Sequence, residues 1–562
     1  MIMTMSGHDE LMGLAERYWD SFLAAKPSDA TLLGDRRFDD RIEDLSVAAE
    51  ERLLSTWREL LRQVEALDAE RLDPTDRITR GLLRTELTNA VERLEWRPLE
   101  MAADQMEGVH AYVLTLAPQT NAPQPENALA LVQRYRQFGT MLSQAVARFR
   151  DGLAAGRVPA RITIERSLNQ LDGYLSSELS EDPFVTLAGP PDWAGTADWR
   201  AELTEVAREV IRPAFQSYRE TLFDELLPVS RPDDKPGLCW LGADGEDIYR
   251  RQLRYHTTLP DLGADEIHDL GLTELAALRE EYATIGERLF GTADLGEIFG
   301  RLRDDPALRY ADGEQIMFDA RRALTSATAE MGNWFGRLPK ESCDIVPVPE
   351  FLAADAPAAY YFPPAADGSR PGTYFVNQYH PTGRGQFETA SVAFHEAIPG
   401  HHLQLTIANE LDHLPRFQRQ SYANTAFVEG WALYTERLAD EMGLYEDDLG
   451  RLGMLSGDSW RSCRLVVDTG LHTKGWSRQQ AIDFMVANAP VGIAEITTEV
   501  DRYIAMPGQA VGYKIGQLEI RRQRLAATER LGSAFDIKAF HDVVLGSGSV
   551  SLPVLRELVA TL

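Results

Sequence analysis

Apolar side chains recur at helical spacing along most of this 562-residue chain, and that pattern limits the folds it can adopt. One series advances by one, three or four residues: Leu53, Leu54, Trp57, Leu60, Leu61, Val64 and Leu67. Two further series are Leu131, Tyr135, Phe138 and Leu142, and Leu275, Leu278, Tyr282 and Ile285. Each places its apolar residues on one face of an amphipathic helix. Strand-like runs are scarce, and the clearest, residues 373–377, lies between turn-forming residues. The sequence therefore predicts a mainly α fold with a small β element just ahead of a histidine-rich segment.

Two segments rich in proline and glycine, residues 183–191 and 228–247, are the best candidates for loops between domains. We place the boundary at the first of them. This gives an N-terminal helical region, residues 1–190, and a helical region carrying the candidate site, residues 191–562. We expect the two regions to be lobes of one architecture.

The charge balance of the chain argues against polyanionic partners. There are 57 basic and 87 acidic residues, which leaves a net charge of −30. Such a surface repels nucleic acid and anionic bilayers, so we expect neither as a partner. Three widely spaced cysteines are too few for a disulfide framework and indicate a reducing compartment. The first ten residues lack the features of a secretion signal and no apolar run could span a bilayer, so we predict a cytoplasmic protein.

Histidines are concentrated in one short segment. Five of the eleven lie between His380 and His413, and three of these are in HEAIPGHH at residues 395–402. A helical H-E-x-x-H motif places two imidazoles one turn apart, where both can bind zinc and the glutamate lies beside them. We interpret His395 as the first ligand and Glu396 as a general base. His380 and His413 have no informative spacing, and we expect them at the surface or in supporting positions.

The spacing within this segment departs from the regular motif. Pro399 stands where the second histidine would be, and His401 is about 120° further around an ideal helix than His395. Proline breaks the helix and Gly400 tolerates unusual backbone angles, so we expect a bulge or break that brings His395 and His401 to one ion. His402 stays open as an alternative second ligand.

The third zinc ligand must come from elsewhere in the chain. Glu429 lies 28 residues after His401 and is followed by Gly-Trp. On an antiparallel helix its carboxylate would complete a two-His, one-Glu site with an open fourth position, which is typical of catalytic zinc. The alternative is that Glu429 belongs to a solvated helix face and that the histidines are buried polar residues.

Two downstream segments carry further candidates. Arg464, Asp468 and His472 are spaced to share one helical face; we assign substrate binding to Arg464 and catalysis to His472, with an exposed ion-pair ladder as the alternative. After a Pro-Gly break, Tyr513 is a candidate oxyanion donor and Lys514 a candidate substrate-binding residue. A core tyrosine with a satisfied hydroxyl is the alternative for Tyr513.

Four motifs together carry a family resemblance: HEAIPGHHLQ, AFVEGWALYTE, RLVVDTGLH and RYIAMPGQAVGYKIGQL. They resemble the bacterial domain-of-unknown-function family 885 over nearly the whole chain. That family looks like a relative of the all-helical gluzincin zinc metallopeptidases, the group of thimet oligopeptidase, angiotensin-converting enzyme and the thermostable carboxypeptidases.

The resemblance implies a large helical, two-lobed fold with a deep channel and the zinc helix on its floor. It implies the roles given above for His395, Glu396, His401 and Glu429, and it makes Tyr513 similar to the tyrosine that those enzymes offer to the tetrahedral intermediate. The strand at residues 373–377 is placed like their substrate-lining edge strand, which makes Tyr374 a candidate substrate-binding residue.

Three functions are compatible with these residues. The first is a cytoplasmic Zn²⁺ peptidase acting on short peptides, and the second is a zinc hydrolase of a non-peptide amide or ester. The third is a catalytically silent helical protein that binds peptide or metal. Glu396 beside His395 favours an enzyme, because a site that only binds a ligand needs no general base.

Overall fold

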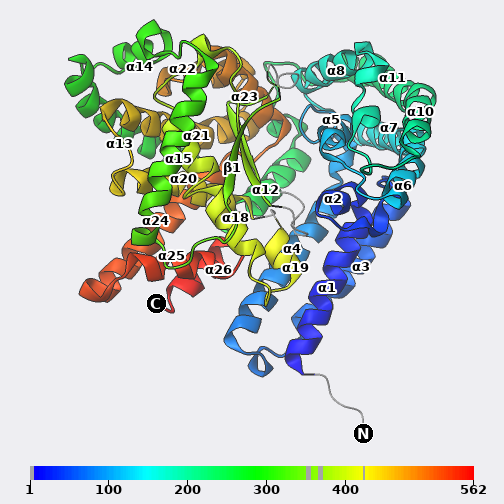
Figure 1. The fold of residues 1–562 in the computed structure, drawn as a ribbon, viewed down its shortest axis with the longest axis horizontal. Coiled ribbons are helices and arrows are strands. Elements are labelled where there is room, and N and C mark those ends of the chain that lie inside the picture. Colours follow the sequence, from blue (N-terminus) through cyan, green and yellow to red (C-terminus); the bar gives the residue numbers. More distant parts are fainter. Residues whose placement is uncertain (1–5, 350–352, 354–355, 365–370, 422–423) are drawn as a thin grey trace.

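We describe the protein from a computed structural model, which covers residues 6–349, 353, 356–364, 371–421 and 424–562. Helices dominate it, as predicted (Figure 1). The N-terminal lobe contains α1 (Gly7–Ala25), α2 (Pro27–Leu32), α3 (Val47–Ala66), α4 (Pro74–Trp96), α5 (Val109–Leu116), α6 (Pro125–Tyr135), α7 (Phe138–Ala154), α8 (Arg161–Ser176), α9 (Pro183–Thr186), α10 (Thr196–Val206) and α11 (Arg212–Thr221).

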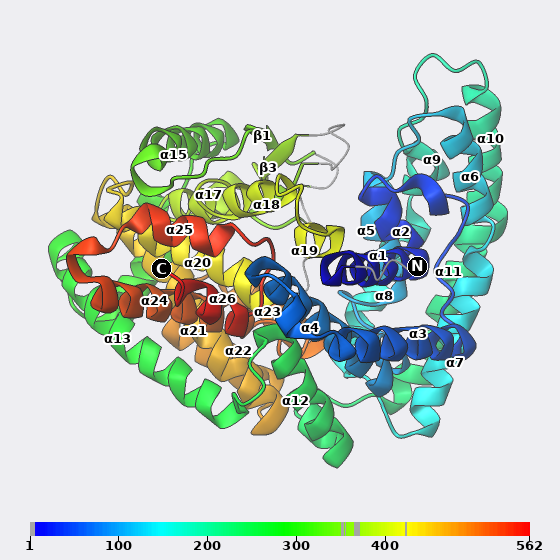
Figure 2. The same ribbon diagram turned by 90° about the horizontal axis from the view of Figure 1, so that it is seen from below.

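The C-terminal lobe contains the remaining helices: α12 (Ala243–Thr257), α13 (Ala264–Phe290), α14 (Leu295–Asp304), α15 (Gly313–Trp334), α17 (Thr389–Glu396), α18 (His401–Asn409), α19 (Arg416–Gln420), α20 (Thr425–Glu441), α21 (Asp448–Thr473), α22 (Arg478–Asn488), α23 (Ile493–Ala505), α24 (Gly512–Leu531), α25 (Ile537–Leu545) and α26 (Leu552–Val559). The lobes lie side by side in two perpendicular views, with α4 and α12 between them (Figures 1 and 2).

The helices follow the apolar patterns of the sequence, with one exception. The first series lies in α3, where the Ser46 side chain accepts a hydrogen bond from the Ala49 amide and caps the helix. The third series lies in α13. The second is divided between α6 and α7, which are separated at residues 136–137 although the spacing continues across the break. Periodicity therefore located the buried faces but not this helix end.

Hydrophobic packing forms two clusters. One is confined to the N-terminal lobe, between Ala103 and Leu226, and includes residues of both α8 and α10. The larger cluster joins α1, α3 and α4 to the C-terminal lobe. Packing thus continues across residue 190, where we placed the boundary. It changes from one cluster to the other near residues 228–247, the second loop that the sequence marks.

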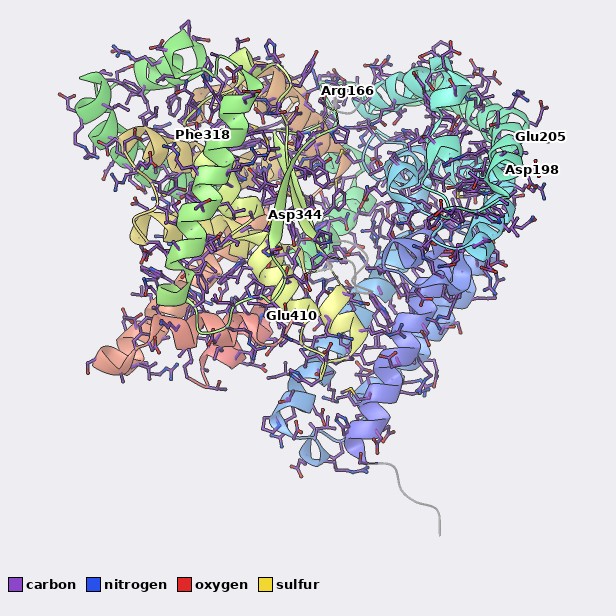
Figure 3. All side chains as sticks on the ribbon, in the orientation of Figure 1. Arg166, Asp198, Glu205, Phe318, Asp344 and Glu410 are labelled. Atoms are coloured by element: carbon purple, nitrogen blue, oxygen red, sulfur yellow. The ribbon has the colours of Figure 1, made fainter. Side chains whose placement is uncertain are left out.

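Charged contacts also join the lobes. Arg166 of α8, labelled in Figure 3, pairs with Asp501 of α23 at 2.7 Å. Arg416 of α19 pairs with Glu16 and Asp20 of α1 at 2.6 and 2.8 Å. No helix in the described part of the chain is long and apolar enough to cross a membrane.

The β element is a three-stranded sheet of β1 (Cys343–Pro347), β2 (Ala359–Phe362) and β3 (Gly372–Val376). Its order is β1-β3-β2, with β3 parallel to β1 and antiparallel to β2. β3 is the predicted strand, shifted by one residue. The prediction that it is an edge strand is wrong, because β3 has a partner on each side, and β1 and β2 are the edge strands of the described sheet.

A cleft of about 2000 Å³ lies between the lobes. Side chains of α1, α3 and α4 line one wall. The opposite wall comes from β2, α17, α18, α20, α21 and α23, together with Tyr513 at the start of α24. The expectation of two lobes around a deep channel is confirmed, and the histidine-rich segment lies in its wall.

Candidate metal centre

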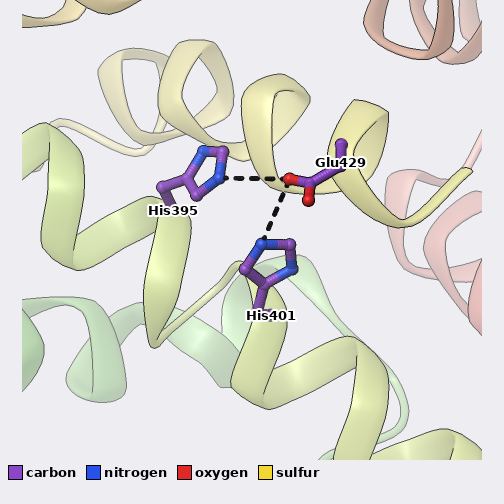
Figure 4. Close-up of side chains that lie close together, drawn as sticks. All are labelled: His395, His401 and Glu429. Carbon is purple, nitrogen blue, oxygen red and sulfur yellow. Dashed lines mark ion pairs between the residues drawn. The ribbon is translucent and has the colours of Figure 1, made fainter. Parts of the chain in front are cut away.

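His395, His401 and Glu429 converge in the cleft wall (Figure 4). The Nε2 atoms of His395 and His401 lie 3.6 and 3.5 Å from the same Glu429 oxygen, Oε2. In a tetrahedral zinc site with bonds of about 2.1 Å, neighbouring ligand atoms are about 3.4 Å apart. Both separations fit this geometry, and all three ligand atoms lie within 4.8 Å of one another, so the three side chains could hold one zinc ion.

The chain breaks between the two histidines as the spacing predicts. α17 ends at Glu396 and α18 begins at His401, and the His402 amide donates to the Ala397 carbonyl at 3.0 Å across the break. Gly400 has a φ of −80° and a ψ of −126°, outside the regions that L-residues ordinarily occupy, which agrees with the unusual backbone angles expected there. A Cβ atom on Gly400 would also overlap the carbonyl oxygen of His395, so the close approach of the two helix ends requires glycine.

α20 runs antiparallel to this segment, as predicted. Successive contacts pair Glu429 with His401, Trp431 with Pro399, and Glu436 with His395. Trp431 is fully buried and its indole N–H donates to the Pro399 carbonyl at 3.0 Å. This hydrogen bond joins the break to α20 two residues beyond Glu429.

Glycine sets the position of the next helix. A Cβ atom on Gly430 would overlap Gly516, and one on Gly516 would overlap the Ala426 carbonyl, so α20 and α24 can cross this closely only with glycine at both positions. The crossing lies beside Glu429 and one turn from Tyr513. The Tyr513 ring consequently lies 6.4 Å from the His395 ring, at 16° to it.

The sequence reasoning missed the supporting role of Glu436. This carboxylate is buried and accepts from His395 Nδ1 at 2.8 Å, and Ser391 Oγ donates to it at 2.8 Å. A carboxylate on the far nitrogen of a histidine fixes the ring and leaves Nε2 free for a metal. The signal was available, because Glu436 lies two helical turns after Glu429 and shares its face.

The electrostatics of the site suit a cation. Burial alone would lower the pKa of His395, but Glu429 and Glu436 raise it to about 9 in the protein alone. Burial opposes the charged form of Glu429 as well, yet both histidines hold the pKa of this carboxyl well below its usual range. A divalent metal would replace the proton that the raised pKa keeps on His395, so metal binding should release a proton.

Replacing Glu436 with glutamine tests this support. Glu436→Gln keeps an oxygen that can accept from His395 but removes the charge, so we expect zinc affinity to fall by about 10- to 100-fold. Competition with a chromophoric chelator at fixed pH measures the affinity. Glu441→Gln is the matched control, because Glu441 ends the same helix and pairs with Arg524, away from the site. Equal losses in the two variants would remove Glu436 from metal support.

Glu396 lies in the cleft wall beside the two histidines, half-buried. Burial raises the pKa of its carboxyl, and His395 and His401 oppose that rise. A carboxylate with a pKa shifted toward neutrality is suited to accept a proton near pH 7. Glu396 therefore lines the same cleft as the three clustered side chains.

The remaining predicted residues divide into two groups. Tyr513 and Arg464 line the cleft. The structure contradicts three assignments, because His472, Lys514 and Tyr374 are buried and do not line it.

The contacts of each of the three explain why its side chain lies away from the cleft. Backbone groups hold both ring nitrogens of His472, at Leu238 N and Tyr503 O. The Lys514 ammonium pairs with Asp458 at 2.5 Å and Glu274 at 3.0 Å. Tyr374 lies on the face of β3 turned away from the cleft, whereas its neighbour Phe375 lines the cleft with β2.

The other histidines are now placed. His402 is fully buried, with Nδ1 2.9 Å from the Tyr361 hydroxyl and Nε2 3.1 Å from the Glu341 carbonyl oxygen. It belongs to packing under the sheet, and the ligand group contains His401 instead. His380 and His413 are exposed, as expected for surface residues. The alternative of an exposed ion-pair ladder is wrong, because Arg464, Asp468 and His472 are all buried.

Comparisons with known proteins match this chain over nearly its whole length. The family model described as bacterial protein of unknown function (DUF885) matches residues 27–559. A candidate lipoprotein from Colwellia psychrerythraea has 26% identity and a TM-score of 0.91, with 99% of each chain covered. A candidate lipoprotein of unknown function from Shewanella oneidensis shares the fold, with 19% identity and a TM-score of 0.76 over 97% of this chain and 99% of that one. No curated protein matches.

Proposed function

This chain belongs to the DUF885 family of bacterial proteins, and we propose that it is a zinc-dependent hydrolase that cleaves short peptides. One observation carries the proposal: His395, His401 and Glu429 form a three-ligand group in a deep cleft with Glu396 beside it. Structural zinc sites use four protein ligands, and catalytic sites use three. The resemblance of the motifs to gluzincin peptidases supports the same reaction.

Each residue of the site has its own role in the proposed hydrolysis. His395, His401 and Glu429 would hold a zinc ion, which would supply Lewis acidity toward a carbonyl group and lower the pKa of a water molecule. Glu396 accepts the proton of the attacking water and passes it to the leaving amine. The Tyr513 hydroxyl, on the adjacent wall, donates a hydrogen bond to the oxygen that becomes negatively charged. Arg464 lines the same wall and is the candidate contact for a substrate anion.

Two features favour a peptide over a smaller amide or ester. The cleft volume of about 2000 Å³ exceeds that of pockets for small ligands. Aromatic side chains of the sheet, Tyr360, Phe362 and Phe375, also line the cleft wall and could contact the side chains of an extended peptide.

The cellular location of the protein bears on which peptides it could meet. All three cysteines are unpaired, in agreement with the predicted cytoplasmic location. The descriptions of the two similar structures as candidate lipoproteins favour an anchored or secreted protein instead. Cell fractionation with an antibody to the chain distinguishes the two.

Metal analysis and a peptide digest test the proposal together. We expect about one zinc per chain in protein purified without chelator, and chelator-sensitive cleavage of a peptide library. Glu429→Ala should lose both, because it removes the ligand shared by the two histidine contacts. Equal zinc in parent and variant would contradict the metal site. Zinc without peptide cleavage, followed by cleavage of ester or anilide substrates, would assign the non-peptide hydrolase instead, and no hydrolysis of either kind would leave a binding protein.

A further inference from the structure

Three residues on one face of α21 contact the segment of chain that leads into Tyr513. We propose that Arg464, Asp468 and His472 are positioning residues that fix residues 503–512 and thereby place the Tyr513 hydroxyl beside the candidate metal centre. This inference rests on the proposed function, since it gives Tyr513 a role in hydrolysis. Two of the four family motifs, RLVVDTGLH and RYIAMPGQAVGYKIGQL, contact each other through these residues and form one structural unit.

His472 holds the start of the segment. Its Nδ1 accepts from the Leu238 amide at 3.2 Å, so Nε2 carries the proton and donates to the Tyr503 carbonyl at 3.0 Å. Both contacts are to backbone, so they fix the path of the chain rather than one side chain. The ring is fully buried.

Asp468 holds the turn between α23 and α24. Both of its oxygens accept from the Gly508 amide, at 3.0 and 3.2 Å, and Oδ1 also accepts from the Tyr249 hydroxyl at 2.6 Å. Gly508 has a φ of +81°, a left-handed conformation that favours glycine. Asp468 is fully buried and has no ion pair among the described residues, which makes its carboxylate costly to bury. It accepts instead from a backbone amide and a hydroxyl, as a residue that fixes a turn requires.

Arg464 links both ends of the segment. Its Nε donates to the Tyr503 hydroxyl at 2.9 Å, and one terminal nitrogen donates to Glu499 at 2.9 Å. Its guanidinium carbon lies 4.4 Å from the centre of the Tyr513 ring, within the range of a cation–π contact. Arg464 therefore packs directly against the ring that faces His395.

The position of Tyr513 depends on this segment because Tyr513 is the second residue of α24. The crossing at Gly430 and Gly516 fixes α24 one turn later, and the contacts of α21 fix the chain before the helix begins. Asp468 and His472 do not line the cleft, so any effect they have on hydrolysis must be indirect, and their contacts with the Tyr503 carbonyl and the Gly508 amide provide a route through the segment.

A double-mutant cycle tests the proposal. Asp468→Asn in the parent should lower kcat on a chelator-sensitive peptide by about tenfold, with zinc content unchanged. In a Tyr513→Phe background the same substitution should cost less than about twofold, because the group it positions is already absent. Thr469→Val is the matched control: Thr469 is fully buried on the same helix but its hydroxyl bonds His268, on the other side. It should have the same small effect in both backgrounds.

Fluorine NMR gives a readout that does not need activity. In protein labelled with 3-fluorotyrosine, the Tyr513 signal is identified by its loss in Tyr513→Phe. It should shift or broaden in Asp468→Asn and stay in place in Thr469→Val. If Asp468→Asn does not fold, His472→Leu replaces it, and His472→Gln, whose amide can both donate and accept, should restore signal and activity.

The outcomes separate the two proposals. Equal losses of kcat in both backgrounds, or an unmoved Tyr513 signal, would overturn the positioning role while leaving the hydrolase intact. A parent without chelator-sensitive hydrolysis would overturn the proposed function, and the NMR signal alone would then decide whether α21 sets the position of Tyr513.

Discussion

Replacing Glu396 with glutamine is expected to lower hydrolysis by at least about a hundredfold, the low end of general-base contributions. Glutamine has nearly the same shape as glutamate but cannot accept the proton of the attacking water. Zinc content should stay at the parent level, because Glu396 is outside the ligand group of His395, His401 and Glu429. The measurement is kcat/KM on a chelator-sensitive peptide, with zinc determined on the same sample.

A second glutamate in the same part of the chain provides the control for this loss. Glu410 follows α18 and accepts from the Lys340 amide outside the cleft lining, so Glu410→Gln should keep parental turnover. Turnover by Glu396→Gln within twofold of the parent would remove Glu396 from the mechanism. Loss of zinc in that variant would instead mean that its carboxylate supports the metal.

The cluster of His395, His401 and Glu429 could be predicted because the two histidines belong to one short motif. His395, Pro399 and His401 lie close together in the sequence, and simple helix geometry shows that a regular helix cannot serve both histidines. The prediction that Glu429 joins the two histidines required only one further assumption, that its helix runs antiparallel to their segment. The contacts from Glu429 to Glu436 along α20 confirm that assumption.

The errors concern exposure, which helical spacing does not report. Arg464, Asp468 and His472 share a face as predicted, but the face is buried against residues 503–508, about 35 positions later in the chain. A polar face normally indicates solvent. Here each of the three side chains has hydrogen-bond partners that are distant in the sequence and that only the tertiary structure supplies.

The β element shows a similar limit. Alternation along a strand assigns Tyr374 and Phe375 to opposite faces but does not say which face meets a cleft. The second partner of β3 is β2, whose four residues are too few to give a periodic signal. Only the structure therefore shows which strand of the sheet faces the cleft.

Substituting the two adjacent histidines separately should give opposite results for zinc. His401→Ala is expected to lower zinc affinity by more than about a hundredfold, because it leaves two of three protein ligands. His402→Ala should keep about one zinc per chain. It should instead lower the free energy of unfolding by about 1–3 kcal/mol, because the Tyr361 hydroxyl and the Glu341 carbonyl lose their partner. Chelator competition and denaturant unfolding measure the two quantities on the same preparations.

The two substitutions are informative because His401 and His402 are adjacent and both buried, but their side chains contact different groups. His401 presents Nε2 to Glu429 at 3.5 Å, whereas both nitrogens of His402 are used under the sheet. General damage to α18 would weaken zinc binding in both variants, and His402→Gln, which retains a donor and an acceptor, would then show less damage. Zinc kept by His401→Ala and lost by His402→Ala would place His402 on the ion. The chain would then have to rearrange at Gly400, because His402 could reach Glu429 only if the helix end turned away from the sheet.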